Sequence, residues 1–452
     1  MLELDQTHDP AVASWVESAN RAGCDFPLQN LPFGIFRRRG QAEVFRVGVA
    51  IGSAIVDLSH AAVSKLLAPD TAHACRAAVL NELMAMGTAA PGEIRRALWK
   101  GLRAGAPARG ELAAALVEQA DAELALPADI GDFTDFFSSL HHATRVGRLL
   151  RPDQPLFPNY KWLPVAYHGR ASTVQVSDRP VVRPWGQVRA SADEAPRLSP
   201  SQRVDYELEL GVFVGRGNAD GRPIRVAEAW DHVFGLVMLN DWSARDIQAW
   251  EYQPLGPFLA KNFATRISPW VVTSQALVPF RAPRQRPDQD PRPLAYLQDD
   301  EDEKRGMLDI RLEVRIQTEA MRRAGNGSHC LSRSNASDAY WTIAQLLAHH
   351  TINGCVLRSG DLIGTGTLSG PLEEQGGCLL ELSRAGSAPV GLGDGERRTF
   401  LQDGDSVELY GWCEREGAAR VGWGAVTGRV LPASGPDSAP AVHADELIKK
   451  IN

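Results

Sequence analysis

Two glutamates in one short segment are the first residues whose types and spacing suggest chemistry. Residues 206–214 alternate as a β-strand does, so a period of two puts Glu207 and Glu209 on one face, about 7 Å apart. Carboxylates placed in this way repel each other and need a cation or a shared proton. A solvent-facing polar side of the strand is the alternative, although the same face continues with Gly211 and Phe213 rather than with charge.

Two aspartates could complete a metal site with these glutamates. Asp241 ends the apolar run 234–240, and Asp135 lies in the aromatic and acidic segment 132–137. Each also has a structural explanation, because Asp241 could cap a helix that begins at residue 242 and Asp135 could be a first-turn acid. The four carboxylates would form an all-oxygen site of the kind that Mg²⁺ or Ca²⁺ prefers, whereas zinc would take His or Cys. No EF-hand loop is present, so the ligands would have to converge from separate segments.

His142 is the candidate general base. It lies seven residues after Asp135, and if the intervening segment is helical the two side chains share a face about 10 Å apart along the axis. That spacing leaves room for a substrate between a metal and a base, but a purely structural histidine is the alternative. His141 would point elsewhere, because adjacent residues on a helix do not share a face. We expect His349 and His350 to be packing and surface residues.

Other catalytic machinery is missing from the sequence. It contains no G-x-S-x-G elbow and no phosphate loop of the G-x-x-x-x-G-K-[ST] kind. The glycine-rich run 364–370 suits either a tight backbone bend against a ligand or a simple turn. The six cysteines form no C-x-x-C pair, and their scatter favours a reducing compartment, so we expect a cytoplasmic protein.

Composition excludes several classes of protein. The chain has 452 residues and a net charge of −7, with 44% apolar and 23% charged residues, as expected for a globular protein of two or three domains. Its mildly acidic charge gives no footprint for nucleic acid. No run approaches the roughly 18 apolar residues of a membrane span, and the acidic N-terminus lacks the apolar segment of a signal peptide. We therefore expect neither a nucleic-acid partner nor a membrane partner.

The elements that must position these residues fall into two parts. Residues 35–58 predict a small β unit, and residues 72–124, rich in Ala and Leu, predict two or three helices with breaks at 91–92 and 105–107. The rest is rich in β structure, with strands predicted at 171–182, 206–214, 233–239, 270–272, 308–317, 379–382 and 406–412.

Helices and loops complete this outline. A helix is predicted to end near Leu150, and another to begin at Ser337 or Asp338 and to end at Gly354. Residues 281–305, rich in proline and charge, predict an exposed loop. We divide the chain into domains 1–124 and 125–432, followed by a tail, residues 433–452.

Several longer runs, in this order along the chain, resemble the fumarylacetoacetase family of C–C bond hydrolases. They are DFPLQNLPFG (25–34), GDFTDFFSSLHHAT (131–144), LPVAYHGRAS (163–172), NDWSARDIQAWEYQPLGPFLAK (240–261), GTLSGP (366–371) and LLELS (379–383). The resemblance covers nearly the whole chain. It implies a mainly β, α+β protein in which a small SH3-like N-terminal domain precedes a mixed β-sandwich roll, and which acts as a homodimer.

The resemblance also implies a set of site residues. The family's metal ligands fall on Asp135, Glu207, Glu209 and Asp241, with Lys261 and Thr265 near a bound Mg²⁺ or Ca²⁺. Its catalytic base falls on His142, oriented by Glu381, and the groups around the reacting carbonyl fall on Arg245, Gln248 and Lys261. Its substrate contacts fall on Phe137, Arg151, Tyr167, Gln248, Tyr252 and Thr367. One position departs from the pattern, because the family usually has Tyr where this chain has Phe137, so a hydroxyl contact is lost.

The implied activity is metal-dependent hydrolysis of 4-fumarylacetoacetate to fumarate and acetoacetate, the last step of phenylalanine and tyrosine degradation. His142 would activate water, and a divalent ion would stabilise the enolate that leaves. One alternative is a related β-diketone or acylpyruvate hydrolase, or a decarboxylase, of the same superfamily. Another is a β-rich binding module whose carboxylates hold a structural ion.

Overall fold

Short apolar segments broken by glycines form the first sheet of the computed structural model, which describes residues 3–189, 191, 193–393 and 395–435. Three antiparallel strands from the predicted β unit pair with two later strands, in the order β4 (Leu116–Glu118), β3 (Ala54–Asp57), β2 (Arg46–Ile51), β1 (Phe33–Arg38) and β5 (Ala122–Ala125). The small β unit is confirmed, but the helical stretch predicted to reach residue 124 ends earlier, because its last residues complete this sheet.

The Ala- and Leu-rich segment beside this sheet is helical, as predicted. Its helices are α1 (Ala61–Ser64), α2 (Pro69–Ala74), α3 (Asn81–Ala85), α4 (Ala89–Leu102) and α5 (Arg109–Ala113). The break predicted at residues 91–92 is wrong, since α4 runs through them. Pro91 lies in the first turn of α4, where its missing N–H and fixed φ are tolerated.

The central sheet carries the predicted strands around the glutamates. Its strand order is β7 (Ala166–His168), β6 (Phe133–Phe136), β22 (Leu362–Gly364), β13 (Leu208–Val214), β14 (Val233–Asp241), β16 (Thr265–Ile267) and β8 (Val174–Val176), and β17 (Val272–Thr273) also pairs with β14. β13 and β14 are buried along their whole lengths. Strands covered on both faces are mostly apolar, which explains the composition of both strands away from Glu209, Asn240 and Asp241.

A second sheet of this larger part packs on one face of the central sheet. Its order is β21 (His329–Asn335), β20 (Arg311–Gln317), β25 (Ser406–Cys413), β26 (Val421–Leu431) and β9 (Val181–Val182). The main core, to which Leu236, Leu312 and Leu409 belong, lies between the two sheets. Another core joins Phe213 and Phe234 of the central sheet to Val49 of the N-terminal sheet. The mainly β, α+β class is therefore confirmed.

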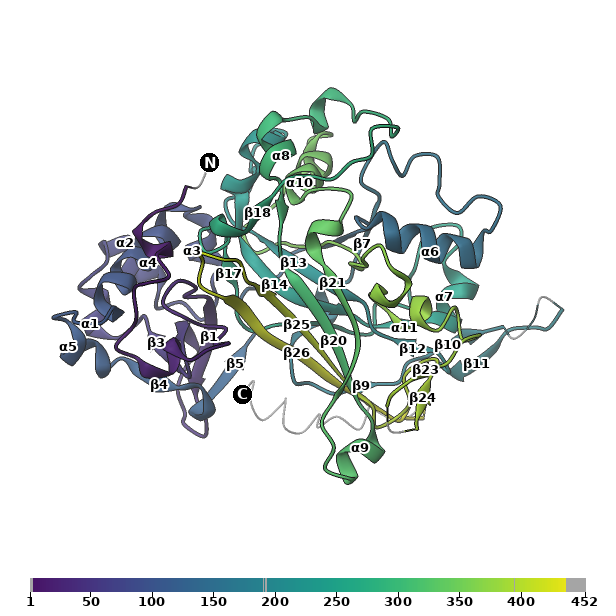
Figure 1. Ribbon diagram of the computed structural model, residues 1–452, viewed down its shortest axis with the longest axis horizontal. Helices are drawn as coiled ribbons and strands as arrows, with labels where there is room; N and C mark the ends of the chain where they lie inside the picture. The colour runs from purple at the N-terminus through teal and green to yellow at the C-terminus, as the bar shows by residue number, and fades with distance from the viewer. Residues whose placement is uncertain (1–2, 190, 192, 394, 436–452) are drawn as a thin grey trace.

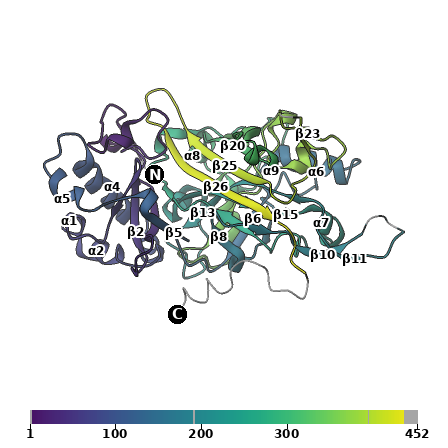
Figure 2. The same cartoon turned by 90° about the horizontal axis from the view of Figure 1, so that it is seen from below.

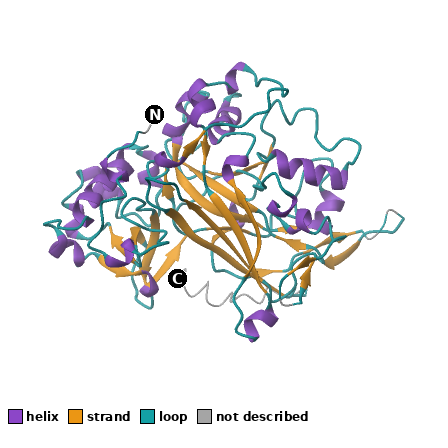
Figure 3. Ribbon diagram, viewed as in Figure 1, coloured by secondary structure: helices purple, strands orange, loops and turns teal. Residues whose placement is uncertain are grey.

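Helices and short ribbons surround these sheets (Figure 3). The helices are α6 (Leu140–Leu150), α7 (Arg245–Glu251), α8 (Asp300–Arg305), α9 (Glu319–Arg323), α10 (Ile343–Thr351) and α11 (Leu379–Leu382). The two-stranded ribbons pair β10 (Trp185–Val188) with β11 (Arg197–Pro200), β12 (Val204–Asp205) with β15 (Ser243–Ala244), β18 (Arg281–Ala282) with β19 (Met307–Leu308), and β23 (Val390–Gly391) with β24 (Arg397–Arg398).

The structure differs from three of the predicted elements. Residues 379–382 form the helix α11 instead of a strand. Helix α10 begins after Thr342, which caps it, rather than at Ser337 or Asp338, which lie in a separate 3₁₀ turn. Residues 281–305 are not an exposed loop throughout, since they contain β18 and α8 and bury Leu297 and Asp302.

The N-terminal part lies at one side of the molecule, with the two larger sheets beside it (Figures 1 and 2). Strands β25 and β26 run side by side across the larger part in both views. Within the described ranges, no helix combines the length and apolar character needed to cross a membrane. The predicted tail, residues 433–452, lies outside the described residues from 436 onward.

Candidate active site

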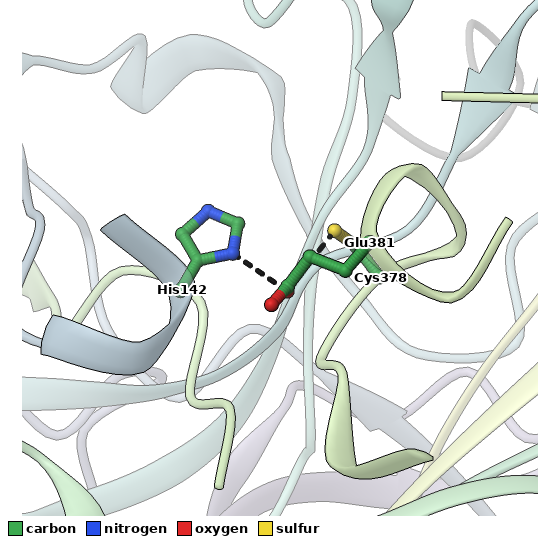
Figure 4. Close-up of side chains that lie close together, drawn as sticks. All are labelled: His142, Cys378 and Glu381. Atoms are coloured by element: carbon green, nitrogen blue, oxygen red, sulfur yellow. Dashed lines mark hydrogen bonds and ion pairs between the residues drawn. The ribbon is translucent and has the colours of Figure 1, made fainter. Parts of the chain in front are cut away.

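His142 and Glu381 come from two separate helices and meet side chain to side chain. Helix α6 begins after Ser139, whose hydroxyl accepts a hydrogen bond from the backbone N–H of His142 at 3.3 Å. Helix α11 carries Glu381, and its Oε1 lies 2.7 Å from Nδ1 of His142 (Figure 4). Both side chains are buried. Because the carboxylate takes Nδ1, Nε2 is left as the ring nitrogen that can accept a proton.

Glu381 is held ionised by its surroundings. Its Oε1 also accepts from the Ser369 hydroxyl at 2.7 Å and lies 3.4 Å from Sγ of Cys378, and its Oε2 accepts from Arg145 at 3.2 Å. Burial by itself would raise the pKa of Glu381, but His142, Ser369 and Arg145 outweigh it and lower this pKa to about 2. A charged carboxylate beside the imidazole fixes the orientation of the ring.

The four carboxylates that the sequence singled out converge in the central sheet. Asp135 lies on β6, Glu207 lies just before β13, Glu209 lies near its start, and Asp241 lies at the end of β14. One carboxylate oxygen from each lies within 4.8 Å of the other three, and all four residues are buried. The alternatives of solvent exposure, helix capping and a first-turn acid are therefore wrong for these residues.

A glycine allows two of these carboxylates to approach each other. Gly364 of β22 lies between β6 and β13, opposite Asp135 on one side and Gly211 on the other. A Cβ at this position would lie 2.5 Å from Oδ1 of Asp135 and 3.2 Å from Oε2 of Glu209. Gly366, two residues later, has a φ of +74° and donates its N–H to the same Glu209 oxygen at 3.1 Å. The glycine-rich run is thus a tight bend against the carboxylates.

Two buried cations neutralise only part of this cluster. Lys261 donates to Glu207 and, at 2.7 Å, to Asp241, while Arg245 donates to Glu207 at 2.7 Å. These cations outweigh burial and lower the pKa of Glu207. Burial raises the pKa of Asp135 to about 8, helped by the charges of Asp241 and Glu207, and it also raises the pKa values of Asp241 and Glu209.

The donor set fits a hard divalent cation. Oδ1 of Asp135 and Oε1 of Glu209 are buried and have no hydrogen-bond partner among the described residues. Buried polar atoms are normally paired, so two bare carboxylate oxygens in one cluster indicate that something else satisfies them. Four carboxylates without His or Cys match the ligand preference of Mg²⁺ or Ca²⁺.

Comparison with known proteins adds an independent line of evidence. A model of the fumarylacetoacetate (FAA) hydrolase C-terminal family matches residues 133–430, and a model of the fumarylacetoacetase N-terminal family matches residues 29–127. The fumarylacetoacetases of Rattus norvegicus and Homo sapiens are each 47% identical to this chain, over 91% and 90% of it and 97% of their own lengths. That of Oryza sativa subsp. japonica is 46% identical over 93% of this chain and 97% of its own.

The chain belongs to the fumarylacetoacetase family. The resemblance noted in the sequence is thereby confirmed, as is the prediction of a hydrolase of this family.

Several positions carried over from the fumarylacetoacetase family lie around the carboxylates. The hydroxyls of Tyr167 and Thr265 donate to Asp241 at 3.1 and 3.2 Å. Gln248 accepts from Arg245 at 3.0 Å, and the buried Thr367 hydroxyl has no partner among the described residues. A cavity of about 120 Å³, lined by Tyr167, Asp241, Lys261 and Thr265 among others, opens beside them.

The remaining positions lie beside the base or apart from it. The ring of Phe137 meets the His142 ring edge to face, with centroids 5.2 Å apart. Arg151, at the C-terminal end of α6, packs on the ring of Phe157 at 4.1 Å. The Tyr252 hydroxyl accepts from Gln253 at 3.1 Å. No contact joins Arg151 or Tyr252 to the carboxylate cluster within the described part of the chain.

Sequence reasoning placed Asp135 and His142 on one possible helix, and this geometry is wrong. Asp135 lies on β6 and His142 on α6, with Ser139 beginning the helix between them. The sequence analysis also missed Asp205 and Arg145, which contact Arg245 and Glu381, respectively. Both could have been found, because Asp205 continues the two-residue period of the glutamates and Arg145 follows His142 by one helical turn.

Proposed function

We propose that this chain hydrolyses the C–C bond of fumarylacetoacetate to give fumarate and acetoacetate. Membership in the fumarylacetoacetase family, with relatives matched over nine-tenths of the chain, supports this substrate. The single observation that carries the proposed chemistry is the buried 2.7 Å contact between His142 and Glu381 beside four buried carboxylates. A structural ion alone would need neither the imidazole nor its carboxylate partner, so a non-catalytic binding module is disfavoured.

In this proposal, Nε2 of His142 takes a proton from water as the water oxygen bonds to the carbonyl carbon of the fumaryl group. The C–C bond then breaks as the new carboxyl group of fumarate forms, and its electron pair leaves as the enolate of acetoacetate, which takes the proton back from Nε2 of His142 onto its carbon. Glu381, kept ionised by its neighbours, stabilises the imidazolium that forms. General-base help of this kind contributes about 10²- to 10⁴-fold in rate.

Arg245 is the proposed donor to the tetrahedral oxyanion, together with Gln248 and Lys261. Its Nη2 is buried without a partner among the described residues, whereas its other nitrogens bind Asp205, Glu207 and Gln248. A pre-positioned donor at an oxyanion is typically worth about 3 to 4 kcal/mol of transition-state stabilisation. The protein thus fixes Nε and Nη1 of Arg245 and leaves Nη2 free to donate to the oxyanion.

We propose Mg²⁺ or Ca²⁺ as the cofactor, held by Asp135, Glu207, Glu209 and Asp241, with Lys261 and Thr265 beside it. The two unpartnered carboxylate oxygens support this ligand set. When bound, a divalent ion supplies Lewis-acid polarisation to the oxygens of a β-diketone and lowers the energy of the departing enolate.

The proposed substrate contacts follow from the family resemblance, and the geometry supports some better than others. Tyr167 presents its hydroxyl at the carboxylate cluster, Thr367 has a buried hydroxyl without a partner among the described residues, and Phe137 presents an apolar ring beside His142. Arg151 is the natural partner for a substrate carboxylate because a guanidinium binds carboxylates with two hydrogen bonds. Gln248 and Tyr252 complete the set.

The domain boundaries, assembly and setting of the enzyme are also part of the proposal. We propose domains at residues 1–124 and 125–432, a homodimer, and a cytoplasmic role at the end of phenylalanine and tyrosine degradation. Analytical ultracentrifugation of the purified chain tests the dimer, and a single species of one-chain mass would contradict it.

The decisive test is to replace His142 with Ala and to follow loss of the diketone absorbance. We expect turnover to fall by at least about 10²-fold, while His349→Ala, on helix α10 and bonded to Tyr296, keeps normal turnover. Near-normal turnover by the His142 variant would end the assignment of the base. Product analysis separates the alternatives, because pyruvate released from an acylpyruvate, in place of fumarate and acetoacetate, would favour the related hydrolases.

A further inference from the structure

Asp205 lies between the two halves of the active site. It ends strand β12, two residues before Glu207, and is fully buried. Its Oδ1 accepts from the backbone N–H groups of Tyr206 at 2.9 Å and Leu379 at 2.8 Å, and its Oδ2 accepts from Leu380 N–H and from Nε of Arg245, each at 2.9 Å. Both carboxylate oxygens are therefore fully engaged.

Two of these four bonds are made to the helix that carries Glu381. The N-cap of α11, Cys378, provides no side-chain hydrogen bond to the helix, so the amides of Leu379 and Leu380 would lack partners without Asp205. Glu381 follows Leu380 directly. Fixing these two amides therefore fixes the helical turn from which Glu381 reaches His142.

The fourth bond leads to the other half of the site. Arg245 uses Nε for Asp205 and Nη1 for Glu207, at 2.9 and 2.7 Å. One carboxylate thus sets the orientation of the guanidinium and of the helix that bears Glu381. Loss of either contact would leave a buried donor unpaired, and such networks are sensitive to the removal of a single member.

We propose that Asp205 is a positioning residue that holds Arg245 and the His142–Glu381 pair in a common register. Only the kinetic test of this inference rests on the proposed function. Asp205 touches neither substrate nor reacting atoms and acts through Glu381 and Arg245. The alternative is that Asp205 is only a buried counter-ion for Arg245, with no effect on the base.

The test compares Asp205→Asn with a matched control, Asp405→Asn. Asp405 is also buried and accepts from an arginine, Nε of Arg398 at 2.8 Å, and from a backbone amide, that of Gln402 at 2.9 Å, outside the active site. Each oxygen of Asp205 accepts two hydrogen bonds, so the NH₂ group of an asparagine would face two donors and could accept from neither. We expect kcat to fall about 10- to 100-fold for Asp205→Asn, with a smaller change in KM, and to stay near normal for the control.

A double-mutant cycle with Glu381→Gln separates positioning from general destabilisation. If Asp205 acts partly through Glu381, the double variant is slower than Glu381→Gln but faster than the product of the two single effects predicts, whereas independent effects multiply. The NMR resonance of the proton between Nδ1 of His142 and Oε1 of Glu381 provides a readout without substrate. We expect it to shift or broaden in Asp205→Asn and to remain in Asp405→Asn.

The possible outcomes distinguish a failure of the proposed function from a failure of the positioning role of Asp205. A wild-type chain that does not hydrolyse fumarylacetoacetate overturns the proposed function, while the resonance still decides the role of Asp205. Multiplying effects in the cycle, or an unchanged resonance with near-normal kcat, overturns the positioning role. If Asp205→Asn does not fold while the control does, Asp205→Glu, which keeps the charge, is tested by the same criteria.

Discussion

Replacing Glu381 with Gln should weaken both folding and catalysis, and the size of the first effect follows from the site. The pKa of this carboxyl falls from an ordinary 4.5 to about 2, which corresponds to about 3 kcal/mol in favour of the ionised form in the folded protein. The side chain itself is fully buried, so solvent screens little of this. Gln removes the charge, and it also places an amide group opposite the donors of His142, Ser369 and Arg145.

The pH dependence gives the sign of the effect. A carboxyl whose pKa is lowered by folding stabilises the native state above its unfolded pKa and loses that contribution as the pH falls through its folded pKa. The difference between wild type and Glu381→Gln should thus be about 3 kcal/mol at pH 7 and shrink to about 1 kcal/mol near pH 3. Urea unfolding of both proteins across this range, at fixed metal concentration, measures it.

Activity provides the second readout. The imidazole loses the carboxylate that orients it, so kcat at pH 7 should fall by about 10²- to 10⁴-fold. Glu313→Gln is the control, because Glu313 is also buried and paired with Arg315 and Arg333, but it lies on β20 outside the site. The reasoning is refuted if the stability difference is the same at pH 7 and pH 3, or if Glu381→Gln turns over normally.

Three further predictions concern metal binding, substrate affinity and the N-terminal segment. Because the pKa of Asp135 is about 8 without metal, binding of Mg²⁺ should release protons from the protein. The affinity for Mg²⁺, measured by calorimetry in two buffers, should therefore rise with pH up to about 8, and an affinity that does not depend on pH would contradict this. Phe137→Tyr, which adds a hydroxyl beside His142, should lower KM by about 2- to 10-fold in steady-state assays, and an unchanged KM would argue against a substrate contact there. Arg95→Met should lower the free energy of unfolding by about 3 kcal/mol without altering kcat, because Arg95 is buried and bonded to three backbone carbonyls; unchanged urea unfolding would contradict this.

The carboxylate strand was the most predictable part of the site. The two-residue period placed Glu207 and Glu209 on one face, and the absence of further charge on that face favoured burial, as the structure has it. The apolar run before Asp241 correctly predicted the end of a buried strand. The two-residue period could not predict which strands are neighbours in the sheet. Strand β22 lies between β6 and β13, and its three residues are too few to show a pattern.

The His142–Glu381 pair was the part of the site that the local sequence pattern predicted least well. Residues 379–382, a short and mostly apolar run, were predicted to form a strand, but the segment is too short for periodicity to distinguish one helical turn from an extended chain. Its conformation depends on Asp205, a residue 174 positions earlier whose carboxylate pairs with the helix amides. Partnerships over such separations leave no local signal, and here the family resemblance supplied Glu381.

The parallel pairing of Phe133–Phe136 with Leu362–Gly364 bears on how the protein is made. During synthesis, the N-terminal sheet and its helices can form while the ribosome is still translating the larger part. Asp135 is synthesised early, yet its neighbour in the sheet is Gly364. His142 likewise has no carboxylate partner until Glu381 has left the exit tunnel. No nascent or truncated chain that stops short of that point can hold a complete set of catalytic groups, and the long-range pairing makes slow maturation of activity the expected behaviour.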